Sequence, residues 1–216
     1  MSRALSNAIY HPPDDESAVR RLVLRSWVRY VASRGSVHSK DKKVLPARTL
    51  VLGGAASGKS AYAESLAEIA RKSKAYIATA QAFDDEMRAK IDRHQTARGS
   101  GWHTIEEPFD LATALSQAPE DGVVLLDCAT LWLSNHLLAE HDLQKEQDKL
   151  LDALLGADQP IIVVSNEVGH GVVPENRLAR RFRDAQGQLN IALAAQCDLV
   201  VQVVAGLPRA LKGSLP

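Results

Sequence analysis

The sequence predicts an α/β fold in which helices cover both faces of a mostly parallel sheet. Between residues 49 and 204, short runs of Val, Ile and Leu alternate with longer segments of helical periodicity, which is typical of buried parallel strands joined by helices. The runs GVVLLD (Gly122–Asp127) and PIIVVS (Pro160–Ser165) are continuously apolar, as strands buried on both faces are. A glycine-rich turn leads directly from the first strand into a helix. Since such folds bind ligands at the carboxyl ends of their strands, functional residues are expected there.

Hydrophobic periodicity and turn residues give the expected order of elements. Strands are expected at 49–52, 75–79, 102–105, 122–127, 160–165 and 198–204, and helices at 59–71, 84–97, 110–117, 130–138, 143–155 and 174–196. Asp110 lies at or near the N-cap of a short helix, and Pro174 opens the longest one. The strand at 198–204 closes the series.

The turn after the first strand has the form G-x-x-x-x-G-K-S, which is the phosphate-binding loop of nucleotide-binding enzymes. Its residues are Gly53, Gly54, Ala55, Ala56, Ser57, Gly58, Lys59 and Ser60. Backbone N–H groups of such a loop and the positive end of the following helix bind phosphate oxygens. Lys59 is expected to reach the β and γ phosphates, and the Ser60 hydroxyl to bind Mg²⁺. The alternative is a glycine-rich turn before an ordinary helix, which eight matching residues between a strand and a helix disfavour.

Asp127 ends an apolar strand downstream of this loop. Enzymes with a phosphate-binding loop keep a second carboxylate at such a strand end, where it holds Mg²⁺ or its bound water. The alternative is an aspartate that caps the next helix. The strand-end position favours the metal or ligand role.

His94 lies on the predicted helix 84–97, and Met87, Ile91 and His94 follow the i, i+4, i+7 spacing of one apolar face. An imidazole on such a face is often a hydrogen-bonded core residue. A neutral imidazole is also a competent nucleophile toward phosphorus. Spacing alone leaves both interpretations open.

A second glycine-containing loop follows the strand at 160–165. Asn166 and Glu167 stand at its ligand-facing end, and Gly169 and Gly171 give the loop freedom to wrap a ligand. The helix after it has an apolar face, on which we place Leu178, Phe182, Ala185, Leu189 and Leu193, and a charged face with Arg177, Arg180, Arg181 and Asp184. These arginines either bind phosphate or a neighbouring subunit, or form an ordinary solvated face.

Composition excludes several classes of protein. The chain of 216 residues has 26 Lys and Arg against 26 Asp and Glu, so no net charge favours nucleic acid or an anionic membrane. Two cysteines form no disulfide framework and suit a reducing compartment. No apolar run approaches the roughly 20 residues of a membrane span, and residues 1–34 do not resemble a secretion signal. We therefore expect a cytoplasmic protein.

Residues 1–48 differ from the rest. A partial amphipathic helix with several arginines is expected at 17–32, followed by a polar, basic linker at 33–43. We interpret residues 1–48 as an extension, poorly ordered or a single helix, and residues 49–216 as the nucleotide-binding catalytic domain. Contact of the basic helix with a membrane surface or a partner is the alternative.

Five stretches resemble one known enzyme family and together cover nearly all of residues 49–204. They are LVLGGAASGKSAYAE, YIATAQAFDDEMRAKIDRHQ, GWHTIEEP, VVLLDCATLWLSN and VVSNEVGHGVVPENRLARRFRDAQGQLN. The chain is similar to the bifunctional adenosylcobinamide kinases / adenosylcobinamide-phosphate guanylyltransferases of cobalamin biosynthesis.

This resemblance implies a RecA-like phosphate-loop NTPase fold, a homotrimer and two reactions. A nucleoside triphosphate, ATP or GTP, phosphorylates adenosylcobinamide. GTP then transfers GMP to a histidine of the enzyme, and this histidine carries over onto His94. Adenosylcobinamide phosphate next takes the GMP from the histidine, which gives adenosylcobinamide-GDP. Mg²⁺ would be held by Ser60 and Asp127. Besides Gly53–Ser60, the nucleotide contacts carry over onto Thr79, Ala80, Gln81, Gln95, Thr96, Ala97, Arg98, Glu106 and Asp127.

The sequence departs from the family pattern at two positions and is ambiguous at a third. Ala56 stands where members commonly carry arginine, and His170 where they often carry an apolar residue. Glu106 is preferred over Glu107 as the nucleotide contact because of its distance from Trp102. Two alternatives remain: a small-molecule kinase that has lost guanylyl transfer, and a GTP-binding regulatory module.

Overall fold

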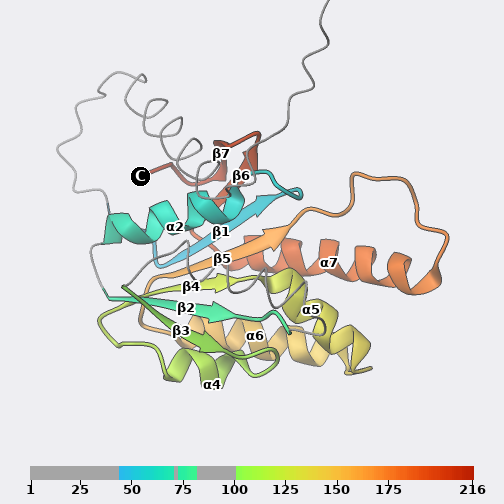
Figure 1. Cartoon of the computed structure of the whole chain (residues 1–216), viewed down its shortest axis with the longest axis horizontal. Coiled ribbons are helices and arrows are strands. Elements are labelled where there is room, and N and C mark those ends of the chain that lie inside the picture. Colours follow the sequence, from blue (N-terminus) through green and yellow to red (C-terminus); the bar gives the residue numbers. More distant parts are fainter. Residues whose placement is uncertain (1–43, 71–72, 82–100) are drawn as a thin grey trace, which may run out of the picture.

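The computed structural model describes residues 44–70, 73–81 and 101–216. Its centre is a seven-stranded sheet with the strand order β3-β2-β4-β5-β1-β6-β7 (Figure 1). Neighbouring strands are parallel except for β6 and β7. The strands are β1 (Arg48–Gly53), β2 (Lys74–Ala78), β3 (Trp102–Glu106), β4 (Val123–Asp127), β5 (Ile161–Asn166), β6 (Leu199–Val204) and β7 (Leu207–Lys212). The helices are α2 (Lys59–Ala70), α4 (Leu111–Ser116), α5 (Ala129–Leu138), α6 (Leu143–Gly156) and α7 (Arg177–Gln196).

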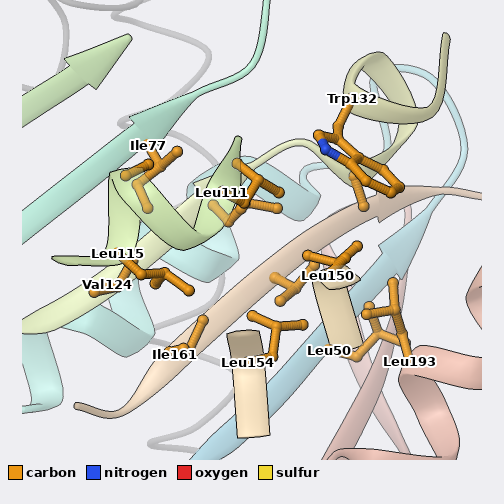
Figure 2. Close-up of a cluster of buried hydrophobic side chains, with 14 of the residues drawn as sticks. Leu50, Ile77, Leu111, Leu115, Val124, Trp132, Leu150, Leu154, Ile161 and Leu193 are labelled. Atoms are coloured by element: carbon orange, nitrogen blue, oxygen red, sulfur yellow. The ribbon is translucent and has the colours of Figure 1, made fainter. Parts of the chain in front are cut away.

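Two separate hydrophobic clusters form on the two faces of this sheet. Successive residues of one strand alternate between them: Leu50 belongs to the cluster under α4–α7, and Val51 to the cluster under α2. Figure 2 shows the first cluster, where Leu50 and Ile161 of the sheet lie near Leu150, Leu154 and Leu193 of the helices. Burial on both faces explains why the strands read as continuous apolar runs. The expected α/β fold, with helices on both faces of a mostly parallel sheet, is confirmed.

Leu189→Ala is expected to lower the free energy of unfolding by about 2–5 kcal/mol, because Leu189 is fully buried between α7 and the sheet. Ile191 lies two residues away on the same helix and is 73% exposed, so Ile191→Ala should change the same free energy by less than about 0.5 kcal/mol. Urea unfolding of both variants measures the difference. Equal losses would show that α7 does not pack as described.

The longest helix begins later than its proline suggested. The prediction of a start at Pro174 is wrong, since α7 begins at Arg177. The Asn176 side chain caps it by accepting a hydrogen bond from the Leu178 amide at 2.7 Å, which satisfies a donor that the helix itself leaves unpaired. Leu178, which we placed on the apolar face, is 46% exposed at this end of the helix.

The sheet extends one strand beyond the predicted last one. β7 pairs antiparallel with β6 across Ala205 and Gly206, whose φ angles of 50° and 77° suit a tight hairpin turn. Pro208 and two basic residues make this strand difficult to recognise in the sequence. A proline is tolerated here because β7 is at the edge of the sheet.

The other expected elements are present with ends shifted by a residue or two. Asp110 caps α4 as predicted, because its Oδ1 accepts a hydrogen bond from the Thr113 amide at 3.1 Å. Leu45, which precedes β1, is buried in the cluster under α2. The predicted helix 84–97 and residues 1–43 of the proposed extension lie outside the described residues.

Candidate active site

The carboxyl ends of five parallel strands meet at one edge of the sheet. Strand register places Gly53 of β1 beside Asn166 of β5, Asp127 of β4 beside Ala78 of β2, and Ala78 beside Glu106 of β3. The structure thus brings the glycine-rich loop, Asp127, the residues after β2 and Glu106 to the edge where ligands bind in such folds.

The glycine-rich loop is held by the strands on both sides of β1. The Glu167 amide donates to the Gly53 carbonyl at 3.1 Å, and the Gly206 amide donates to the Ser57 carbonyl at 2.8 Å. Gly58 has a φ of 92°, and Ala56, at the position where the family commonly carries arginine, has a φ of 51°. The loop therefore contains two residues in the left-handed region, where glycine is favoured.

Gly53 allows the loop to turn tightly against β6. A Cβ atom at this position would lie 2.3 Å from Ser57 Oγ and 2.8 Å from the Val203 carbonyl oxygen. The serine can rotate, but the carbonyl is backbone of β6, a strand that is paired on both sides, and cannot move freely. At Gly54, a Cβ atom would meet nothing within 4 Å.

Gly53→Ala is therefore expected to destabilise the nucleotide-free protein by about 1–3 kcal/mol, as overpacking does. Gly54→Ala should leave its thermal unfolding temperature close to that of the wild type. Scanning calorimetry without nucleotide separates the two variants. A Gly53→Ala protein as stable as the Gly54→Ala protein would disprove the tight contact with β6.

Lys59 and Ser60 form the first turn of α2, directly after the loop. The Lys59 ammonium donates to the Gly54 carbonyl at 3.2 Å, so it lies back over the loop.

Asp127 is free to act on a ligand. The residue at the N-cap of α5 is Cys128, not Asp127, and it makes no side-chain capping bond. Among the described residues, none donates a hydrogen bond to the Asp127 carboxylate. The capping alternative for Asp127 is therefore wrong.

The donor set suits Mg²⁺. The described residues contain no group of three or more His, Cys, Asp and Glu side chains that could enclose a metal. A magnesium site rarely needs three such side chains, because the ion usually binds one or two carboxylates and completes its coordination shell with waters and substrate phosphates. Asp127 and the Ser60 hydroxyl fit that pattern.

Cys128 is unsuited to act as a nucleophile at this edge. Burial raises the pKa of its thiol to about 11, and neighbouring Asp127 adds to the rise. At neutral pH the thiol therefore stays protonated, and the reactive thiolate is absent.

Thr79 uses its side chain inside the fold. Its hydroxyl donates to the Cys128 carbonyl at 2.8 Å and accepts from the Cys128 amide at 2.9 Å. The Asn135 side chain also donates to the Thr79 carbonyl at 2.8 Å. Because Thr79 is fully buried, the more exposed Ala80 and Gln81 are the better placed of these three predicted nucleotide contacts.

The two neighbouring glutamates have different environments. Glu107 Oε1 accepts hydrogen bonds from the Phe109 and Asp110 amides, both at 2.9 Å, and so shapes the turn before α4. Glu106 ends β3 and is exposed. Its exposed position at the carboxyl end of β3, where ligands bind in such folds, supports the choice of Glu106 as the nucleotide contact.

Several predicted site residues are not described by the structure. His94 and the four residues after it, Gln95, Thr96, Ala97 and Arg98, lie outside the described residues. Gln81, the last described residue before this segment, follows β2 at the carboxyl edge. The position of His94 relative to the phosphate-binding loop therefore stays a prediction.

The predicted arginine face of α7 is partly committed to the fold. Arg180 donates to the Pro174 carbonyl at 2.9 Å and also to the Glu175 carbonyl, so it holds the end of the preceding loop. Arg177 and Arg181 are exposed. His170, one of the departures from the family pattern, is exposed on the same loop.

A buried histidine supports the turn next to Glu106. His136 of α5 is 2% exposed, and its Nδ1 lies 2.9 Å from Nδ1 of His141. Its Nε2 lies 3.4 Å from the Phe109 carbonyl, to which the Trp132 indole also donates at 2.9 Å.

Acidification is expected to destabilise the protein through this cluster. Burial lowers the pKa of His136 below its ordinary value of 6.5, with His141 and Lys149 acting in the same direction, and the Phe109 carbonyl and Glu146 opposing them. The neutral ring thus contributes stability that is complete above about pH 6.5 and is lost as the pH falls toward the folded-state pKa.

Denaturant unfolding at pH 7.5 and 5.5 tests this expectation. The stability of wild type should fall more than that of His136→Gln, which cannot titrate. Exposed His103 provides the control for the substitution itself, since His103→Gln should keep the wild-type stability at pH 7.5. Equal pH dependence in wild type and His136→Gln would contradict the assignment.

The family follows from comparison with known proteins. Residues 49–211 match the family described as cobinamide kinase / cobinamide phosphate guanyltransferase. The chain belongs to this family. It is therefore a nucleotide-using enzyme with both of the activities in the family's description.

Three bifunctional relatives align with this chain over almost their whole length. A bifunctional adenosylcobalamin biosynthesis protein CobP of Pseudomonas aeruginosa is 48% identical over 169 residues, covering 77% of this chain and 98% of the relative. Bifunctional adenosylcobalamin biosynthesis proteins CobU of Salmonella typhimurium and Escherichia coli are 42% and 40% identical, each covering 73% of this chain and 96% of the relative.

Within the described residues, every helix is too short or too polar to cross a membrane.

Proposed function

We propose that this chain first phosphorylates adenosylcobinamide and then transfers GMP from GTP to the product, giving adenosylcobinamide-GDP in cobalamin biosynthesis. Membership of the kinase and guanyltransferase family supports both activities. The observation that carries the proposal is the complete G-x-x-x-x-G-K-S loop, held at the same carboxyl edge of the sheet at which Asp127 ends β4. One loop of this kind serves both steps, because each step begins from a bound triphosphate.

In the kinase step, the hydroxyl of adenosylcobinamide attacks the γ phosphorus of ATP or GTP. The bond between this phosphorus and the β–γ bridging oxygen breaks, the nucleoside diphosphate leaves, and the hydroxyl proton passes to solvent. Lys59 and the loop amides stabilise charge on the transferring group. Mg²⁺, bound through the Ser60 hydroxyl and Asp127, would neutralise phosphate charge.

In the guanylyltransferase step, the His94 imidazole attacks the α phosphorus of GTP and pyrophosphate leaves. A phosphate oxygen of adenosylcobinamide phosphate then attacks the same phosphorus, and the P–N bond to His94 breaks. The covalent intermediate splits one transfer into two easier displacements.

The proposed nucleotide contacts extend beyond the loop. They comprise Gly53–Ser60, the stretches Thr79–Gln81 and Gln95–Arg98, Glu106 and Asp127. Thr79, Glu106 and Asp127 share the carboxyl edge with the loop, which supports their grouping. Thr79 would take part through its backbone, because its hydroxyl is bonded to Cys128.

We further propose a homotrimer in the cytoplasm. Val172 and Val173 are 93% and 62% exposed on the loop before α7, which supports a subunit contact there. The described cysteines are free buried thiols, as a reducing compartment favours. Residues 1–48 are the proposed extension to the catalytic domain of residues 49–216.

Turnover with adenosylcobinamide and GTP tests the proposal. Mass spectrometry should detect adenosylcobinamide-GDP, and pyrophosphate should appear in equal amount. Adenosylcobinamide phosphate without pyrophosphate would instead identify a kinase that has lost guanylyl transfer. Tight GTP binding without cobinamide-dependent turnover would identify a regulatory module and refute the proposal.

A further inference from the structure

Asn166 ends β5 at the centre of the active edge. β5 lies between β1, which leads into the phosphate-binding loop, and β4, which ends in Asp127. Asn166 is in register with Gly53, and Val164 of the same strand is in register with Asp127. The next residue, Glu167, donates its amide to the Gly53 carbonyl. Asn166 therefore stands between the loop and the proposed magnesium ligand.

Side chains from two helices hold the backbone of Asn166. Its amide donates to Thr130 Oγ1 of α5 at 2.8 Å, and its carbonyl accepts from Asn190 Nδ2 of α7 at 3.1 Å. The adjacent β1 strand ends at Gly53, so these side-chain bonds fix the position of a residue at the limit of the sheet.

A buried polar layer fixes Asn190 in turn. Ser165 Oγ donates to Asn190 Oδ1 at 2.7 Å and accepts from Gln186 Nε2 at 2.9 Å. Gln186 Nε2 also lies 3.0 Å from Asn190 Oδ1. Ser165 and Gln186 are fully buried, and Asn190 is 7% exposed.

Folding alone does not require this layer. Gln186 and Asn190 occur one helical turn apart on the buried side of α7, between the positions of Phe182, Leu189 and Leu193. Apolar side chains there would avoid the desolvation of polar groups, and Gln186 Oε1 is buried without a hydrogen-bond partner. The hydrogen bonds among Gln186, Ser165 and Asn190 do impose one position on the Asn190 side chain that holds Asn166.

The Asn166 carboxamide itself remains uncommitted. Its Oδ1 is buried without a partner, and its Nδ2 donates to no described residue. Four buried polar side chains thus hold the backbone of Asn166, directly or through one another: Thr130, Asn190, Ser165 and Gln186. The side-chain amide of Asn166 is not used in this network and can contact a ligand. A carboxamide N–H is an uncharged donor suited to a phosphate oxygen.

We propose that Asn166 contacts the phosphate transferred in the kinase step, through a hydrogen bond from Nδ2 to a γ-phosphate oxygen of the bound nucleoside triphosphate. Gln186, Ser165 and Asn190 are positioning residues that act through Asn166. This inference rests on the proposed function, because it needs a triphosphate on the Gly53–Ser60 loop.

Steady-state phosphorylation of adenosylcobinamide tests the contact. Asn166→Ala should lower kcat about 100-fold, the typical effect of losing one donor to the transition state, and leave KM for the nucleotide within about threefold. Asn166→Asp should be at least as impaired, because it exchanges the donor for a negative charge beside phosphate. A kcat equal to that of wild type in both variants would overturn the inference.

Gln186→Leu tests the positioning role. It should lower kcat about tenfold with no loss of thermal stability, and the double variant Asn166→Ala/Gln186→Leu should have the kcat of Asn166→Ala alone, since residues acting through one group are not additive. Gln188→Leu, an exposed change on the same helix, should match wild type. A double variant slower than Asn166→Ala by the full tenfold, or a Gln186→Leu protein with lower stability and wild-type kcat, would make Gln186 a structural residue only.

Different results would overturn the proposed function and the Asn166 contact. Wild-type protein without cobinamide-dependent phosphate transfer would overturn the proposed function and this inference with it. Active wild-type protein with unaffected Asn166 variants would overturn this inference alone.

Discussion

His94→Ala is expected to abolish covalent labelling of the protein by α-³²P-labelled GTP. The proposed intermediate has a P–N bond, and alanine offers no atom to form it. Phosphorylation of adenosylcobinamide should continue at a rate within about threefold of wild type, because loss of a group used in one reaction leaves the other barrier unchanged. Acid-labile label on the wild-type protein, measured after denaturation, gives the reference.

His103→Ala is the matched control for this experiment. His103 is exposed near the start of β3, away from the carboxyl edge, so its alanine variant should be labelled like wild type. Label that survives in His94→Ala would assign the intermediate to another residue. Wild-type protein that forms adenosylcobinamide-GDP without any label would favour direct transfer between the two substrates.

Lys59→Ala is expected to lower kcat/KM about 10²–10³-fold in both reactions, the typical effect of removing one electrostatic contact to the transition state. In the structure the ammonium lies over the loop, 3.2 Å from the Gly54 carbonyl, where it can turn to phosphate. Because both steps begin from a triphosphate in the same loop, both should suffer together. Parallel assays of γ-phosphate transfer and pyrophosphate release measure the two effects.

Lys145→Ala gives the comparison for a lost positive charge. Lys145 is exposed in the first turn of α6, and its removal should leave both rates at wild-type values. A Lys59→Ala protein impaired in only one reaction would show that the two nucleotides bind at separate sites.

The strands at the centre of the fold were predictable because burial on two faces leaves a clear trace in the sequence. Leu50–Leu52 and Val123–Leu126 are apolar without alternation, since consecutive residues enter different clusters. β7 carried no such trace, because it is an edge strand with exposed and charged positions and is identified by its pairing with β6. The start of α7 was misplaced for a similar reason: Pro174 and Asn176 are both plausible first residues, and the Asn176 capping bond selects between them.

The loop residues of the site were also predictable, since chemistry fixes their types and spacing. The roles of other side chains were not. Thr79 and Glu107 look like available polar groups in the sequence, but contacts with Cys128 and with the Phe109 amide use them inside the fold. Gln186 and Asn190 look like solvated positions on a polar helix, but they are buried against Ser165. A possible signal was their i, i+4 spacing beside Leu189 and Leu193.

By itself, the sequence determined the α/β class, the phosphate-binding loop at Gly53–Ser60 and the resemblance to a cobinamide kinase and guanylyltransferase family. These features are local, because a strand, a turn and a helix with the required residues are contiguous in the chain. Tertiary structure alone decided that Asn166 stands between Gly53 and the end of β4, and that α5 and α7 hold it there. Those contacts join residues that are far apart in sequence, so no spacing along the chain encodes them, and strand order and helix packing must form before the groups meet.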